Sequence, residues 1–94
     1  MIMYKFLVAV YIDEKDTEKL KDLCVNNYLE FEDDPVNFHK DSDWQEHYRK
    51  ETGFSGMIKR CYLTLRTIDK KGIDTLFDII ETADFDMMIN MEIS

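Results

Sequence analysis

Residues 3–12 read MYKFLVAVYI, a continuous apolar run that is rich in β-branched and aromatic residues. Such a run is expected of a β-strand that is covered on both faces. Cys61, Leu63 and Leu65 alternate with polar and aromatic residues across 57–68, which predicts a second strand with one buried face. A further alternation at 87–93 predicts a last strand, so these segments together indicate a sheet.

Two amphipathic helices are expected between the strands. Apolar residues at three- and four-residue spacing predict a helix over 17–31, with Asp16 or Thr17 as its cap. A second apolar stripe, at 73–83, predicts another helix before the last strand.

The middle of the chain is expected to form an insert. The sequence Glu-Asp-Asp-Pro at 32–35 should end the first helix, and a short edge strand is predicted at 36–39 because proline fits at the start of such a strand. Ser42 and Gln45 resemble a capping box, which predicts a short helix near 43–52.

The predicted fold class follows from the order of these elements. Strand, helix, short strand, insert, strand, helix and strand is the order of the split βαβ, or ferredoxin-like, arrangement. We therefore expect an α+β fold, with an antiparallel sheet, two helices on one face and a short helical insert between strands 2 and 3. Residues 1–94 should form a single domain, with an acidic insert at about 32–54. Many unrelated functions use this architecture, so the fold alone does not predict one.

The cysteines and the N-terminus bear on the cellular compartment. Cys24 and Cys61 lie within apolar-periodic segments and form no Cys-x-x-Cys pair, so we interpret them as buried free thiols in a reducing compartment. The first apolar run lacks a small-residue cleavage site and is too short to span a membrane. A cytoplasmic location without membrane contact is expected.

The net charge of −8 is unevenly distributed along the chain. Residues 30–46 hold seven acidic residues against Lys40 alone. Residues 47–73 hold seven basic residues against two acidic ones, and residues 74–94 hold six acidic residues and no base. Two acidic blocks therefore flank a basic one.

This charge pattern predicts a non-enzymatic protein that binds a basic partner surface and inhibits or shields the partner. An acidic surface accelerates encounter with a basic protein, and salt weakens the attraction. In size and charge, the chain resembles nuclease immunity proteins and phage-encoded inhibitors of restriction or CRISPR systems, some of which are DNA mimics. The alternative is a solvated surface that only promotes solubility. The predicted partner-binding residues are Glu30, Glu32, Asp33, Asp34, Asp41, Asp43, Trp44, Glu46, Asp74, Asp78, Glu81, Asp84 and Asp86.

Direct binding to nucleic acid is disfavoured by the acidic balance, because phosphate contacts need lysine and arginine. Arg60, Tyr62 and Arg66 share a strand face with Tyr11 and Lys5 on a neighbouring strand, as in RNA-recognition modules. Residues 59–65, however, lack the glycine and the aromatic spacing of the third-strand motif of that family.

Catalytic and metal-binding motifs are sparse. We expect no enzyme and no cofactor, because no nucleophile elbow or phosphate-binding glycine loop is present. His39, Asp43 and His47 are spaced at i, i+4 and i+8, so an alternative function is a small-ligand or metal-binding ferredoxin-like domain that uses this insert. A homodimer that pairs through the last strand, with Met88 on its outer side, is a further alternative.

Overall fold

The computed structural model describes residues 2–35, 42–54 and 56–90. These residues form four strands, three α-helices and one short 3₁₀ helix. In chain order they are β1 (Tyr4–Asp13), η1 (Glu14–Asp16), α1 (Thr17–Asn26), β2 (Glu30–Asp33), α2 (Ser42–Thr52), β3 (Ile58–Thr67), α3 (Gly72–Glu81) and β4 (Met87–Asn90).

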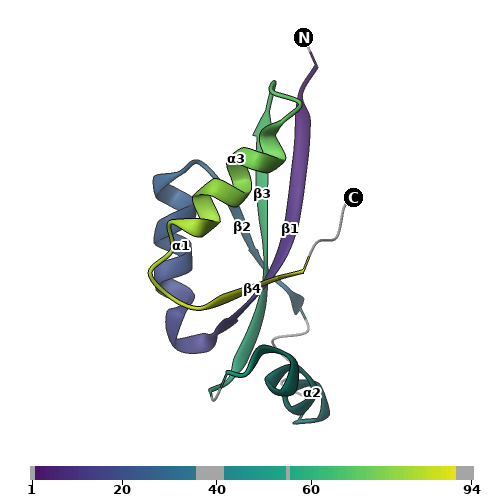
Figure 1. Ribbon diagram of the computed structural model, residues 1–94, viewed down its shortest axis with the longest axis vertical. Helices are drawn as coiled ribbons and strands as arrows, with labels where there is room; N and C mark the ends of the chain where they lie inside the picture. Colours follow the sequence, from purple (N-terminus) through teal and green to yellow (C-terminus); the bar gives the residue numbers. More distant parts are fainter. Residues whose placement is uncertain (1, 36–41, 55, 91–94) are drawn as a thin grey trace.

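The four strands form one antiparallel sheet in the order β2-β3-β1-β4. The long strands β1 and β3 pair from Tyr4↔Thr67 to Asp13↔Ile58, and the short strands β2 and β4 flank only part of them. Figure 1 shows α1 and α3 beside the sheet, with α2 near the start of β3. This is the ferredoxin-like arrangement, so the predicted fold class, including the helical insert between β2 and β3, is confirmed.

The hydrophobic core lies between the sheet and the helices α1 and α3. Alternate residues of β1 and β3 face the helices, because successive side chains of a strand point to opposite faces. Both helices turn their apolar stripes inward against them. The buried core residues are Val8, Val10, Ile12, Leu20, Cys24, Leu29, Cys61, Leu63, Leu65, Leu76 and Ile80.

The predicted extent of the first helix is wrong at its C-terminal end. We expected a helix over 17–31, but α1 ends at Asn26 and residues 30–33 form β2. Tyr28 adopts a φ of 58°, and the Leu29 N–H donates to the Cys24 carbonyl (2.9 Å), which closes the helix as a Schellman motif. The predicted acidic insert therefore loses its first residues to the sheet. The edge strand predicted at 36–39 lies outside the described residues.

Replacing Tyr28 with glycine should raise the free energy of unfolding by roughly 0.5–1 kcal/mol. Tyr28 occupies the left-handed region, which disfavours residues with a Cβ, and its side chain is 93% exposed, so little packing is lost. Urea denaturation measures the change. The control is Asn27→Gly, which should destabilise the protein because Asn27 has a negative φ and its Nδ2 donates to the Leu23 carbonyl (2.8 Å). A loss of stability in Tyr28→Gly would contradict this account of the helix end.

Candidate partner-binding surface

Strands β2 and β3 bring the first acidic block onto the basic block. Their antiparallel register pairs Glu30 with Thr64 and Asp33 with Cys61, so acidic side chains lie beside basic ones of β3. Three ion pairs cross between the blocks: Glu30 with Arg66 at 2.7 Å, Asp33 with Lys59 at 2.9 Å, and Asp34 with Arg60 at 2.5 Å. Much of the negative charge that the sequence places at 30–34 is therefore compensated within the chain.

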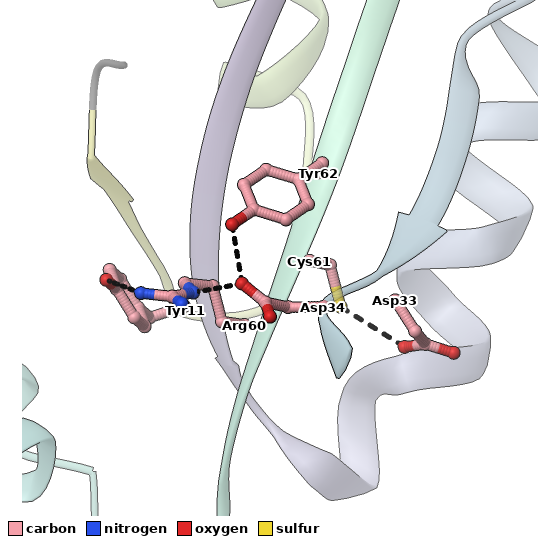
Figure 2. Close-up of polar contacts among 6 residues, drawn as sticks. All are labelled: Tyr11, Asp33, Asp34, Arg60, Cys61 and Tyr62. Atoms are coloured by element: carbon pink, nitrogen blue, oxygen red, sulfur yellow. Dashed lines mark hydrogen bonds and ion pairs between the residues drawn. The ribbon is translucent and has the colours of Figure 1, made fainter. Parts of the chain in front are cut away.

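Asp34 is the centre of a polar cluster on the sheet face opposite α1 and α3 (Figure 2). Its Oδ2 accepts hydrogen bonds from the Arg60 Nε and from the Tyr62 hydroxyl, both at 2.5 Å. The Arg60 Nη1 also donates to the Tyr11 hydroxyl at 3.4 Å. Asp34 is only 5% exposed, so this predicted partner-binding residue joins β2 to β3 and is turned away from solvent.

The aromatic stack between Tyr11 and Tyr48 attaches α2 to the same cluster. The two rings lie parallel within 20°, with centroids 4.6 Å apart, and Tyr11 is completely buried. A side-chain hydrogen bond with Tyr11, together with burial, raises the pKa of Tyr48. Burial opposes the charge on Arg60, but its hydrogen bonds to Tyr11 and Asp34 and the nearby Asp34 charge outweigh burial and raise the pKa of Arg60. Arg60 is therefore a permanent cation within the fold.

Gln45 connects α2 to the start of β3. Its Nε2 donates to the Ile58 carbonyl and its Oε1 accepts from the Ile58 N–H, both at 2.7 Å. Gln45 is buried, and β2 does not extend far enough along β3 to pair with Ile58. The amide side chain thus replaces a neighbouring strand at this position.

Replacing Gln45 with leucine should lower the free energy of unfolding by about 2–4 kcal/mol, because two buried backbone groups of Ile58 lose their partners. Urea denaturation gives the loss, and hydrogen exchange should rise across 42–52 before the rest of the protein unfolds. Glu46→Leu, on the exposed side of α2, is the control and should be near neutral. Equal effects of the two substitutions would contradict the anchoring role of Gln45.

The residues of the second acidic block are exposed along α3 and in the turn that follows it. We name this the α3 surface, which consists of Asp74, Asp78, Glu81, Asp84 and Asp86. Within the described part of the chain, none of these carboxylates has an ion-pair or hydrogen-bond partner. Helix α1 is different, because its acidic residues alternate with lysines and Lys21 lies 3.6 Å from Glu18.

Of the remaining predicted partner-binding residues, some are exposed and the others lie outside the part of the chain that the structure describes. Glu32 is exposed on β2, and Glu46 is exposed on α2, where it lies 3.9 Å from Lys50. Asp41 lies outside the described residues, as do the side chains of Asp43 and Trp44 within α2. The partner-binding role of all these residues stays a prediction.

The histidines of the insert are only partly described. His39 lies outside the described residues, while the His47 Nε2 lies 3.7 Å from the Glu51 Oε1 one helical turn away. Across residues 2–35, 42–54 and 56–90, no group of three or more His, Cys, Asp or Glu side chains is placed to hold a metal ion. The predicted use of His39, Asp43 and His47 stays a hypothesis.

Cys24 and Cys61 are buried free thiols, as the sequence predicts. Burial raises the pKa of Cys24 to about 11, and burial together with the nearby Asp33 charge raises the pKa of Cys61 to about 12. Because thiolate is the nucleophilic form, neither thiol is activated for chemistry at neutral pH.

These pKa values predict a loss of stability at high pH. Below about pH 9 the thiols are protonated in both the folded and the unfolded state, so their contribution to stability is complete. Above it the unfolded thiols ionise first, and the free energy of unfolding falls as the pH rises toward the folded values of about 11 and about 12. Urea denaturation at about pH 8 and about pH 10.5 should show a smaller fall in Cys24→Ala/Cys61→Ala than in the wild type. An equal fall would contradict the prediction.

No helix in the described ranges is long and apolar enough to cross a membrane. No protein-family model matches the chain, and neither a curated protein nor a solved structure matches it.

Proposed function

We propose that the chain is a non-enzymatic binding protein whose α3 surface docks on the basic surface of a nucleic-acid-handling protein, which it inhibits or shields in the cytoplasm. The observation that carries the proposal is the contrast between the two acidic blocks. Glu30, Asp33 and Asp34 are paired within the chain, whereas the five carboxylates of the α3 surface are exposed and, among the described residues, unpaired.

Helix energetics support a role for these residues beyond folding. Asp74, Asp78 and Glu81 repeat at i, i+4 and i+7, so their like charges repel along one side of α3. Glu81 also lies in the last turn, where the helix dipole favours a cation, and no basic residue is present there. A lysine at position 81 would stabilise the helix more than Glu81 does.

The basic side chains of the sheet also favour a protein partner over a nucleic acid. Arg60 and Arg66, which an RNA-binding surface would need, are paired with Asp34 and Glu30. Tyr11, which would have to stack on a base, is completely buried under Tyr48. A basic protein is therefore a better partner for this chain than a nucleic acid.

The test is an affinity capture at low salt from a lysate of the cells that make the protein, with a salt gradient for elution and mass spectrometry for identification. Three baits are compared: the wild type, Asp78→Lys/Glu81→Lys, and Glu18→Lys/Asp22→Lys on α1, which has the same net charge as the α3 variant. We expect a basic nucleic-acid-handling protein to be retained by the wild type and the α1 variant and lost from the α3 variant. Identical captured proteins on all three baits would contradict the proposal.

A further inference from the structure

A small polar cleft opens where the end of β1, the loop after α2 and the turn before β4 meet. Its volume is about 160 Å³. We name it the Asp16 cleft; its lining residues are Asp13, Lys15, Asp16, Gly53, Phe54 and Asp86.

Three carboxylates converge on this cleft. The strand register ends with the pair Ile12 and Met87, and Asp13 and Asp86 are the next residues along the two segments; both line the cleft. Asp13 uses its Oδ1 to accept the Lys15 backbone N–H at 3.1 Å. Carboxylates that line the same small cleft repel one another, so a cation bound among them would be stabilised.

Asp16 adds a largely buried carboxylate to this cleft. It is only 7% exposed, it lines the cleft, and it makes no side-chain capping bond to α1. In the described part of the chain its carboxylate has no hydrogen-bond or ion-pair partner, and the Lys15 ammonium forms no ion pair with it. No fully buried side-chain oxygen in the described part of the chain lacks a partner, so the Asp16 carboxylate keeps some contact with solvent. A carboxylate with so little access to water and no partner is costly, and the N-terminus of α1 offsets this cost only in part.

The surroundings of the cleft indicate which shape of cation it would accept. A wider hollow of about 420 Å³ adjoins it and shares Gly53, Phe54 and Asp86. Met87 and Met88 add apolar surface to this hollow, and Glu51 adds a further carboxylate. An aliphatic stem fits the apolar wall, and a planar cation can stack on Phe54 while it donates to several carboxylates. The arginine side chain combines these properties, whereas a lysine ammonium provides a point charge.

We propose that the Asp16 cleft receives an arginine side chain of the basic partner and acts as the anchor point next to the α3 surface. The proposal rests on the proposed function, because the arginine belongs to the partner that the α3 surface attracts. Asp86 belongs to both the cleft and the α3 surface, so the two sites share this residue.

The test is an NMR titration of the isotope-labelled protein with three acetylated and amidated tripeptides: Gly-Arg-Gly, Gly-Lys-Gly and Gly-citrulline-Gly. Citrulline has the shape of arginine without its charge. We expect the arginine peptide to shift the amides of 13–17, Gly53, Phe54 and Asp86 to saturation, the lysine peptide to bind more weakly, and the citrulline peptide to cause no shifts. Shifts of equal size along α3, or equal binding of the arginine and citrulline peptides, would overturn the proposal.

Asp16→Asn separates binding from folding. The substitution keeps a good helix cap and removes an unpaired buried charge, so the Tm should stay within about 3 °C of the wild type or rise. Binding of the arginine peptide should weaken about tenfold, as for a charge-assisted contact. Asp86→Asn, at an exposed turn position, should also weaken binding. A lower Tm with unchanged binding would assign Asp16 to the fold alone and overturn the proposal.

The captured partner distinguishes this proposal from the proposed function. If Asp78→Lys/Glu81→Lys abolishes partner binding and Asp16→Asn leaves it unchanged, the cleft proposal fails and the α3 surface stands. If neither substitution weakens partner binding, the proposed function itself fails. Weakening by both substitutions supports both proposals.

Discussion

Asp34→Ala is expected to lower the free energy of unfolding by about 3 kcal/mol, because it leaves the Arg60 guanidinium without its carboxylate in a largely buried position. The Tyr62 hydroxyl loses its acceptor in the same variant. Both losses act on the join between β2 and β3, so β2 should exchange its amide protons faster than the rest of the sheet. Urea denaturation and hydrogen exchange measure these two effects.

Glu30→Ala is the matched control for this prediction. It removes a carboxylate from the same strand and breaks an ion pair of similar length, 2.7 Å to Arg66, but both side chains of that pair are more than half exposed. Exposed ion pairs contribute little, so the expected loss is below about 1 kcal/mol. Equal losses in the two variants would show that Asp34 has no special role in the fold. The double variant Asp34→Ala/Arg60→Ala should lose less than the sum of the single variants.

Asp78→Lys/Glu81→Lys is expected to weaken binding of the captured partner by a factor of about 100 or more, because each reversal replaces an attraction by a repulsion at a close charge pair. The same variant should unfold at an equal or higher temperature than the wild type. A lysine at position 81 complements the helix dipole, and a lysine at position 78 attracts Asp74 one turn away, which offsets the repulsion between the two lysines. Isothermal titration calorimetry and thermal denaturation give the two quantities.

Two further variants show which surface matters. Glu32→Lys/Glu46→Lys applies the same change of charge to the exposed remainder of the first acidic block, and Glu18→Lys/Asp22→Lys applies it to α1. We expect either variant to weaken binding far less than the α3 reversal, since net charge acts mainly on the rate of encounter. Equal weakening by all three variants would mean that only net charge matters and that no docking surface exists.

The spacing of apolar residues predicted most of the helices and strands. It gave a wrong helix end at residues 28–31, where the spacing fits both a helix and a strand. Tyr28 and Phe31 continue the three- and four-residue spacing of α1, so the sequence extends the helix through both. Phe31 instead faces the core from β2, where a two-residue period applies. The break depends on the positive φ of Tyr28, a conformation for which glycine or asparagine is the usual signal. Because tyrosine occupies this position, the sequence gives no indication that the helix ends there.

The charge blocks could be read from the sequence, but their pairing could not. Glu30 and Arg66 are 36 residues apart, and their contact depends on the β2–β3 register, which tertiary packing sets. The burial of Asp34 follows from the same register. The alternation along the strands places Tyr11 on the same face as Arg60 and Tyr62, but it does not show that Tyr48 of α2 stacks on Tyr11. By contrast, Asp74, Asp78 and Glu81 lie at helical spacing within α3, so the sequence pattern places them on one side of the helix, and the structure shows them exposed.

The most direct test of the acidic docking surface is the association rate of the purified chain with its captured partner, measured across ionic strength by stopped-flow fluorescence. For electrostatic attraction, the rate constant should fall steeply, by a factor of about 10 or more, between about 50 mM and about 500 mM salt. The dissociation rate should change much less, and Asp78→Lys/Glu81→Lys should flatten the dependence of the association rate on salt. An association rate that does not vary with salt, in the wild type as in the α3 variant, would contradict the account.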